Sequence, residues 1–579
     1  MSAAAKQHWS EIVKEKKIRQ AATIPKEWIL TNLPPKDALN VIDFPKKSGL
    51  LSEKENEITN TEVGTLLQNL ASGAWSAVEV TTAFSKRAII AHQLVNCLTE
   101  IFIERALARA AQLDEHLKTT GKVVGPLHGL PISLKDQVNV EGLESTMGYV
   151  SWIGQYATKN SVLADVLEAS GAVLYVKTNI PQTLMWPETF NHVFGRTLNP
   201  YNRALTSGGS SGGEGALVAL RGSPIGVGSD IGGSIRIPSA FNGLYGLRPS
   251  YHRVPYAGCV NSLEGQEAVP SVLGPISNSL SGIKSFMQSV AAQSPWLKDP
   301  MAIRKAWNEA EYRLSDHGEG KTPLCFAMLW HDEVVLPHPP VMRALERTKE
   351  ALIRAGHQVI DWKPLNHVEI YKNVSTIWTA AAAEDYRIVT APTGEPIIGS
   401  MALTPGELVQ SAIIIPSDPP GFRPSAEGVS AYELWQVHRK RRELRQAYMD
   451  HWNATVSQTG TGRPVDAIIS PCAPYTAPPH GLNRNANYTG IWNALDYTAL
   501  VIPTGLSVDP TIDVKKPAHS FFSETDKSIY ELYDPETFKD APITVQLIGR
   551  TLEEEAVIAM GEVVDAALKA SASSASANL

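Results

Sequence analysis

Hydrophobic residues recur along this chain at two alternating spacings, one typical of helices and the other of buried strands. Apolar positions three and four residues apart predict helices, and short apolar runs bounded by glycine or proline predict strands. We expect helices over 61–71, 76–94, 104–118, 161–170, 340–355, 431–459 and 552–570, and strands over 130–134, 172–176, 358–360, 466–469 and 543–548. Helices and strands that alternate in this way indicate an α/β fold whose sheet is covered by helices.

No linker-like stretch divides the chain into separate units. The first 60 residues are charged and interrupted by prolines, which predicts a leader with a short helix that packs on the body. Residues 61–568 are expected to form a single large domain. Residues 569–579 are small and polar, and a segment of that composition at a terminus is expected to be disordered.

Charge and cysteine usage exclude several classes of protein. Lys and Arg number 52 against 59 for Asp and Glu, so no strongly basic surface is implied and nucleic acid is not an expected partner. The four cysteines are far apart, so we predict no disulfide framework, no metal site and no cofactor. The start of the chain lacks the features of a signal peptide, and no apolar run is long enough to span a membrane. We therefore expect a cytoplasmic protein.

Glycine and serine are concentrated between Gly208 and Gly243. A flexible linker is excluded, because apolar runs such as the one over 216–220 lie between the glycines. The segment matches no phosphate-binding glycine pattern either. Its part 230–234, Asp-Ile-Gly-Gly-Ser, instead predicts a tight turn whose N–H groups converge on one point, as an oxyanion requires.

A nucleophilic serine in this turn would need a base. None of the 15 histidines lies within the segment, and no Gly-x-Ser-x-Gly pattern is present there, so a Ser-His-Asp hydrolase is not indicated. A lysine can act as the base when burial lowers its pKa toward neutrality. Lys135, which follows the apolar segment 130–134, is the best candidate.

These segments resemble the amidase signature family. Residues 208–215 and 228–236 are similar to the signature itself, and residues 131–136 are similar to the lysine motif of that family. Further similar segments extend the resemblance over about residues 60–568: 177–182, 194–200, 246–250, 490–493 and 545–550. The leader looks most like that of the fungal acetamidase group.

The resemblance implies a single α/β domain with a mixed central sheet of about eleven strands, covered by helices on both faces. It also implies a Ser-cisSer-Lys triad, in which Ser234 is the nucleophile, Ser210 is a bridging serine on a cis peptide bond and Lys135 is the base. The implied oxyanion hole and supporting residues are the backbone N–H groups of Ile231, Gly232, Gly233 and Ser234, and the side chains of Ser211, Asp230 and Arg236. Glu214 is expected to complement the positive end of a helix and not to be catalytic.

The activity implied by the resemblance is hydrolysis of a carboxamide to a carboxylic acid and ammonia or an amine, through a serine acyl-enzyme. The group resemblance favours small aliphatic or aromatic primary amides. Fatty acid amides and aryl acylamides are the alternative substrates, and the apolar segment 413–416 would either line a wide acyl channel or seal a small pocket.

An amidotransferase subunit and a non-catalytic scaffold are less favoured, because the chain is acidic and contains all three triad residues. A homodimer is a family expectation. We expect the substrate pocket to be formed by residues within 185–195 and 310–430.

Overall fold

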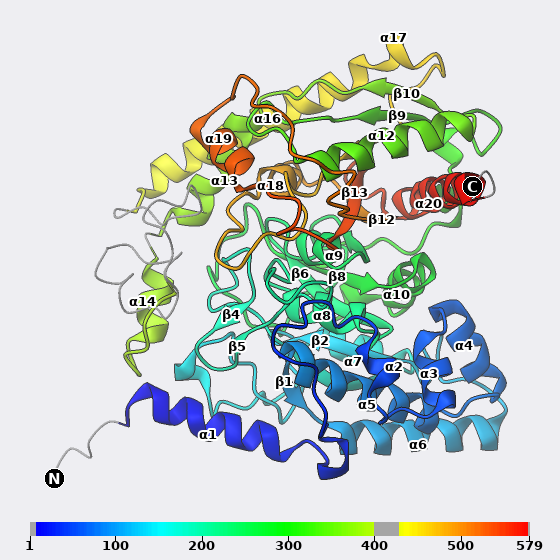
Figure 1. Ribbon diagram of the computed structural model, residues 1–579, viewed down its shortest axis with the longest axis vertical. Coiled ribbons are helices and arrows are strands. Elements are labelled where there is room, and N and C mark those ends of the chain that lie inside the picture. Colours follow the sequence, from blue (N-terminus) through cyan, green and yellow to red (C-terminus); the bar gives the residue numbers. More distant parts are fainter. Residues whose placement is uncertain (1–6, 382, 399–427, 577–579) are drawn as a thin grey trace.

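An eleven-stranded mixed sheet runs through the centre of the protein in the order β1-β3-β2-β6-β8-β7-β12-β13-β11-β9-β10 (Figure 1). The structure is a computed structural model that describes residues 7–381, 383–398 and 428–576. The strands of this sheet are β1 Leu98–Ile101, β2 Pro131–Lys135, β3 Val173–Thr178, β6 Ile225–Asp230, β7 Tyr245–Arg248, β8 Val272–Ser277, β9 Cys325–Met328, β10 Gln358–Asp361, β11 Ala467–Ser470, β12 Ala499–Ser507 and β13 Pro542–Ile548. The expected α/β fold with a mixed central sheet is confirmed.

Helices surround the sheet, and a separate two-stranded sheet pairs β4 Phe190–Asn191 with β5 Gly195–Arg196. The α-helices are α1 Trp9–Ala22, α2 Phe44–Lys47, α3 Glu53–Asn60, α4 Val63–Ser72, α5 Ala77–Val95, α6 Ile103–Thr120, α7 Val162–Ala169, α8 Gly212–Ala219, α9 Arg236–Phe241, α10 Leu280–Ala292, α11 Glu309–Tyr312, α12 Pro339–Arg354, α13 His367–Thr379, α14 Glu384–Thr390, α16 Ala431–Ala454, α17 Val456–Thr459, α18 Asn487–Leu495, α19 Glu524–Leu532 and α20 Glu554–Ser576. Short 3₁₀ helices occur at η1 Lys26–Trp28, η2 Val150–Trp152, η3 Pro295–Leu297 and η4 Ser315–His317.

The elements that the hydrophobic pattern predicted lie close to their expected bounds, whereas strands such as β6, β8 and β12 were not predicted. Helix α6, for example, ends at Gly121 in the left-handed conformation, where the sequence predicted a stop. The single helix expected over 431–459 is divided into α16 and α17. Thr455 lies between them, and its hydroxyl donates to the carbonyl of Trp452 and accepts the N–H of Val465, which ties the end of α16 to the segment before β11.

The C-terminal segment corrects one expectation. Residues 569–579 were expected to be disordered, but α20 continues to Ser576, and 577–579 lie outside the described residues. The segment is rich in alanine, which has the highest helix propensity, and Ser571 is only 8% exposed. Arg354 of α12 also donates a hydrogen bond to Ser571, so the extended helix is held against the body.

The leader packs on the body through α1, which lies along one edge of the molecule in Figure 1. Lys16 of this helix is buried and pairs with the carboxylates of Glu100 and Glu144. Val13 packs on the same side of the helix, in a hydrophobic cluster with Phe194. The leader is therefore attached by both charged and apolar contacts.

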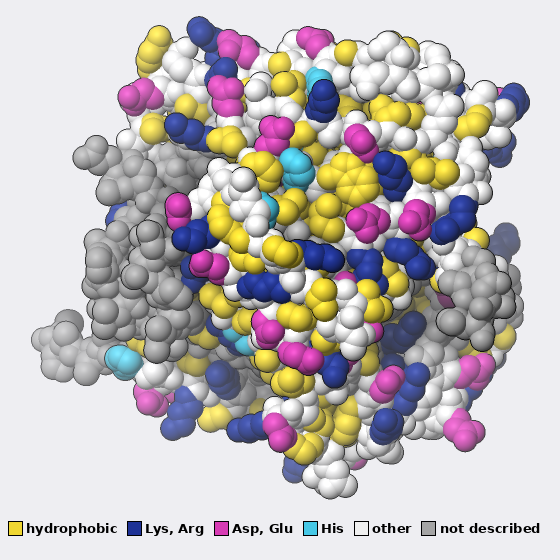
Figure 2. Space-filling view, turned by 45° about the horizontal axis from the view of Figure 1, so that its top comes forward, with side chains coloured by type: hydrophobic (Ala, Val, Ile, Leu, Met, Phe, Trp, Pro, Cys, Tyr) yellow, Lys and Arg dark blue, Asp and Glu magenta, His cyan; other side chains and the backbone are white. Residues whose placement is uncertain are grey.

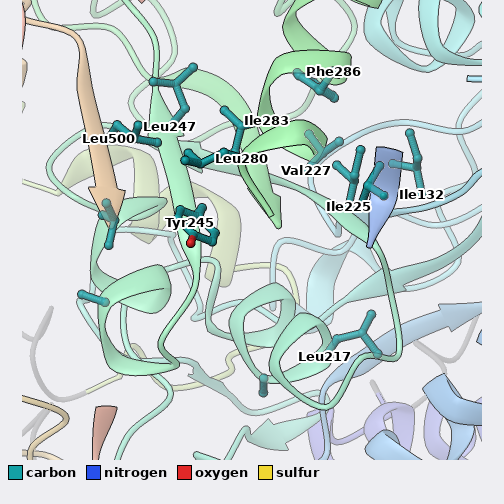
Figure 3. Packing of buried hydrophobic residues seen from close by; sticks show 14 of the residues in the cluster. Ile132, Leu217, Ile225, Val227, Tyr245, Leu247, Leu280, Ile283, Phe286 and Leu500 are labelled. Atoms are coloured by element: carbon teal, nitrogen blue, oxygen red, sulfur yellow. The ribbon is translucent and has the colours of Figure 1, made fainter. Parts of the chain in front are cut away.

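Hydrophobic side chains on both sides of the sheet hold its central strands in place. Side chains of α10, α8 and strands β2, β6, β7 and β12 belong to one cluster of buried residues (Figure 3). On the surface, Lys and Arg side chains lie among Asp and Glu side chains over the face shown in Figure 2. No helix in the described part of the chain is both long enough and apolar enough to cross a membrane.

The sheet topology brings the two sequence motifs together. Strands β2 and β6 are parallel neighbours, with Leu134 paired to Val227, so their carboxyl ends lie at the same edge of the sheet. Lys135 is the last residue of β2, and the turn 231–235 follows β6 directly. Ligands of α/β proteins bind at this edge, beyond the carboxyl ends of the strands.

Candidate active site

Lys135 is fully buried at the end of β2, and its ammonium nitrogen has two hydroxyl partners. Lys135 Nζ lies 2.7 Å from Ser210 Oγ and 2.7 Å from Ser229 Oγ. Burial lowers the pKa of Lys135 well below its usual value, although the charges of Asp230 and Glu214 oppose that shift. Desolvation therefore favours the neutral form of this lysine, and a neutral amine can accept a proton.

Ser210 lies between the lysine and the proposed nucleophile. Its hydroxyl contacts Lys135, and its backbone N–H donates to Ser234 Oγ at 3.1 Å. The structure therefore brings together all three residues that the sequence assigned to the triad. Ser234 is 9% exposed, so its hydroxyl sits at the boundary between the buried network and the space outside it.

The cis peptide bond expected at Ser210 is not found. The described residues contain no cis peptide bond. Gly208 and Gly209 turn the chain instead, with φ of 79° and 59°. A methyl group built on Gly209 would lie 2.5 Å from Cδ of Pro238, so this position needs glycine both for its dihedral angle and for its space. Two consecutive left-handed glycines thus direct Ser210 toward the lysine through a trans bond.

The turn that follows β6 is held by the carboxylate of Asp230. Asp230 accepts hydrogen bonds from the backbone N–H groups of Gly233 at 2.7 Å and Ile235 at 3.2 Å. Gly233 has a φ of 134°, and a methyl group there would lie 2.4 Å from Thr489 Oγ1. The backbone of this turn is therefore fixed from both sides.

The four N–H groups expected to form the oxyanion hole differ in their bonding. The N–H of Gly233 donates to Asp230 Oδ1. The N–H groups of Ile231, Gly232 and Ser234 make no hydrogen bond within the described residues. The turn thus presents three unpaired backbone donors and not four, because the aspartate that shapes it uses the remaining one.

Asp230 and Arg236 form a fully buried ion pair beneath the turn, as expected for supporting residues. Arg236 Nη2 lies 3.0 Å from Asp230 Oδ1, and Asn493 Nδ2 donates to the same oxygen at 2.9 Å. Although burial acts in the opposite direction, the guanidinium of Arg236 holds the pKa of Asp230 at about 2. The carboxylate is therefore charged at every pH at which the turn would act.

Ser211, the third expected supporting residue, acts on Ser229 and not on Lys135 directly. Its Oγ accepts the backbone N–H of Ser229 at 3.2 Å and lies 3.3 Å from the carbonyl of the same residue. Ser229 lies within the signature segment, but the sequence assigned it no role. Its contact with Lys135 depends on the pairing of β2 with β6, which sequence spacing does not reveal.

Glu214 differs from its expected role. It is fully buried, and Ser133 Oγ lies 2.5 Å from its Oε2. Burial raises the pKa of Glu214 to about 8, so the carboxyl group is neutral near pH 7 and does not supply a charge to the helix terminus. A buried environment, which the sequence did not reveal for this position, explains the difference.

Apolar side chains surround the outer side of the turn. Ile231 packs against a cluster that contains Met185, Tyr371 and Trp378. A methyl group built on Gly232 would lie 3.0 Å from Cη2 of Trp378. These contacts lie within the segments expected to form the pocket, whereas segment 413–416 lies outside the described residues.

No group of three or more His, Cys, Asp or Glu side chains in the described part of the chain is placed to hold a metal ion. The site consists of hydroxyl groups, a lysine and backbone N–H groups. This set is suited to nucleophilic attack and stabilisation of an oxyanion.

Comparisons with known proteins agree with this geometry. The family model described as "Amidase" matches residues 79–558. The chain is 44% identical to an acetamidase of Emericella nidulans, over 96% of this chain and 98% of the relative. It is 42% identical to an acetamidase of Aspergillus oryzae, again over 96% and 98%.

Solved structures provide a second comparison. A fatty acid amide hydrolase superposes with a TM-score of 0.87 at 34% identity, over 97% of this chain and 95% of that one. A bacterial aryl acylamidase superposes with a TM-score of 0.65 at 19% identity, over 88% and 96% of the two chains, and supports the fold alone.

Proposed function

This chain belongs to the amidase family, and from that premise we propose that it hydrolyses small carboxamides to a carboxylic acid and ammonia through a serine acyl-enzyme. Ser234 is the proposed nucleophile, Ser210 the bridge and Lys135 the base. The observation that carries this assignment is the position of Ser210 between the other two residues. Its Oγ lies 2.7 Å from the buried Lys135 Nζ, and its backbone N–H donates to Ser234 Oγ.

The proposed reaction begins with neutral Lys135. Ser234 Oγ attacks the amide carbon while its proton passes to Ser210 Oγ, and the proton of Ser210 passes to Lys135 Nζ. The carbonyl oxygen becomes an oxyanion, which the unpaired N–H groups of Ile231, Gly232 and Ser234 are placed to stabilise.

Collapse of the tetrahedral intermediate breaks the C–N bond. The proton returns from Lys135 through Ser210 to the leaving nitrogen, which departs as neutral ammonia or amine and leaves an ester on Ser234. Water then attacks this ester, its proton follows the same route, and the acid is released as Ser234 regains its hydrogen. Lysine thus acts first as a base and then as an acid in each half-reaction.

A small acyl group is the proposed preference. The similarity to two acetamidases supports it, and so does the indole of Trp378, which lies against Gly232 beside the proposed oxyanion donors. The similarity to a fatty acid amide hydrolase at 34% identity favours a long acyl group as the alternative. We propose that one domain carries the whole activity, with the leader packed on it.

A panel of amides tests this assignment. We expect the purified single chain to hydrolyse acetamide and benzamide with a higher kcat/KM than hexanamide or a long-chain fatty acid amide, measured as ammonia released. A preference for the long-chain amide would replace the small-substrate proposal with the alternative. No hydrolysis of any amide by the single chain would contradict the proposed function itself.

Trp378→Ala tests the origin of the size preference. Removal of the indole opens space beside Gly232, so we expect the ratio of kcat/KM for hexanamide to that for acetamide to rise by about 10- to 100-fold. Trp378→Phe retains an aromatic ring at the same position and should give an intermediate ratio. Equal ratios in the wild type and in Trp378→Ala would mean that this indole does not limit the acyl group.

A further inference from the structure

Lys135 is also connected, through Ser229, to a second chain of polar groups. Ser229 Oγ lies 2.7 Å from Lys135 Nζ and 2.5 Å from Gln137 Oε1. The amide nitrogen of Gln137 continues the chain to the hydroxyl of Tyr256 at 2.5 Å and to the carbonyl of Val260 at 3.0 Å. Ser229 and Gln137 are both buried, so water does not compete for these bonds.

The direction of every hydrogen bond in this chain follows from the carbonyl of Val260. A carbonyl oxygen only accepts, so the group of Gln137 that faces it is the amide NH₂. The oxygen of the same amide must then face Ser229 and accept its proton. Because a serine hydroxyl has a single proton, Ser229 Oγ can only accept from Lys135.

This direction constrains the lysine. A neutral amine has two N–H donors and one lone pair, and one of the donors is used on Ser229. The lone pair is then free to point at Ser210, the other hydroxyl that contacts Nζ. We infer that Ser229 and Gln137 are positioning residues that orient the amine of Lys135 so that its lone pair receives the proton of Ser210. This inference rests on the proposed function.

The charged groups around the lysine do not take over this task. Asp230, at the end of β6, is engaged by Arg236 and by the turn. Glu214, on α8, is paired with Ser133.

The carboxylate that directly follows β2 is also engaged elsewhere. Asp136 accepts hydrogen bonds from Thr99 Oγ1 and from the backbone N–H of Met147. The two serine hydroxyls are thus the hydrogen-bond partners that the described residues provide to Lys135 Nζ.

A graded series of variants tests the inference with acetamide as the substrate. Ser229→Ala removes the acceptor from the lysine, and we expect kcat to fall by about 10- to 100-fold with KM changed by less than about threefold. Gln137→Leu leaves the hydroxyl of Ser229 free to rotate and should cost less. Tyr256→Phe leaves Gln137 bound to Val260 and should cost least of the three.

The pH profile separates positioning from a purely structural role. Ser229 Oγ accepts from the lysine and so favours its charged form, which means that removal of the hydroxyl lowers the pKa of Lys135. Because the neutral lysine is the active form, the acid limb of kcat/KM in Ser229→Ala should move to lower pH by about half a pH unit or more. Ser229→Thr retains the hydroxyl and should restore both kcat and the position of the limb.

Ser170→Ala is the matched control, since Ser170 is an equally buried serine whose hydroxyl bonds within its own helix to the carbonyl of Val166. Circular dichroism establishes that each variant is folded. The inference is overturned if folded Ser229→Ala and Gln137→Leu match this control in kcat, or if kcat falls while the acid limb keeps its wild-type position. If either result is obtained while replacement of Lys135 still abolishes activity, the inference alone is rejected. Full activity after replacement of Lys135 would instead reject the proposed function.

Discussion

Ser234→Ala is expected to lower kcat for acetamide by at least about 10⁴-fold, because no acyl-enzyme can form without the hydroxyl. The same variant should lose covalent labelling by a fluorophosphonate probe, which reacts with activated serines. The remaining turn would still present all three unpaired N–H groups, those of Ile231, Gly232 and residue 234, so the residual rate measures binding and oxyanion stabilisation alone. Ammonia release and mass spectrometry of the labelled protein give the two readouts.

Two controls accompany this measurement. Ser170→Ala removes a buried hydroxyl that is not part of the site and should label at the wild-type rate. Ser210→Ala keeps the backbone N–H that binds Ser234 Oγ but removes the bridge, so it should label more slowly than the wild type and faster than Ser234→Ala. Full labelling of Ser234→Ala would assign the nucleophile to another residue.

Lys135→Met is expected to lower kcat by about 10²- to 10⁴-fold, the range that a positioned general base contributes. Burial favours the neutral form of Lys135 and lowers its pKa, so in the wild type the fraction of active enzyme rises as pH increases through that pKa. We therefore expect wild-type kcat/KM to decline on the acid side, where the lysine becomes charged, and this acid limb to disappear in Lys135→Met. The measurement is a pH profile of kcat/KM in both proteins.

Lys177→Met provides a matched comparison, because Lys177 is another fully buried lysine, on neighbouring strand β3. Its Nζ donates to the carbonyl of Glu144 at 2.7 Å and to Ser145 Oγ at 2.6 Å, away from the triad. This variant should lower thermal stability but keep the acid limb. A Lys135→Met enzyme that is folded and retains most of its activity would contradict the proton relay.

Much of the fold follows from local patterns. The helix that ends at Gly121 and the strand that ends at Lys135 were both predicted, because helical periodicity, stop residues and buried apolar runs depend only on nearby residues. The proposed assignment of Lys135, Ser210 and Ser234 to a triad followed from motif resemblance, because matching short motifs requires only residue identities and no knowledge of the geometry. The continuation of the C-terminal helix beyond residue 570 was missed because composition suggested a disordered tail, whereas Ser571 contacts Arg354 of α12.

The parts of the site that were not predicted all depend on long-range contacts. The N–H of Gly233 donates to Asp230 within the closed turn. Gly208 and Gly209, both left-handed, turn the chain before Ser210 where it packs against α9. Trp378 reaches Gly232 from α13, more than a hundred residues away in the sequence.

Residue types and their spacing were therefore sufficient to predict the α/β class, and with the motif resemblance they were sufficient to propose the lysine and the two serines, because those features lie in single short segments. Only the tertiary structure decided which atoms face one another. The parallel pairing of β2 with β6 places Ser229 against Lys135 and leaves Gln137 to orient it, and hydrogen-bond direction is a property of that three-dimensional arrangement. Burial by the whole fold, likewise, lowers the pKa of Lys135 and keeps Glu214 neutral near pH 7, since desolvation depends on all the surrounding elements together.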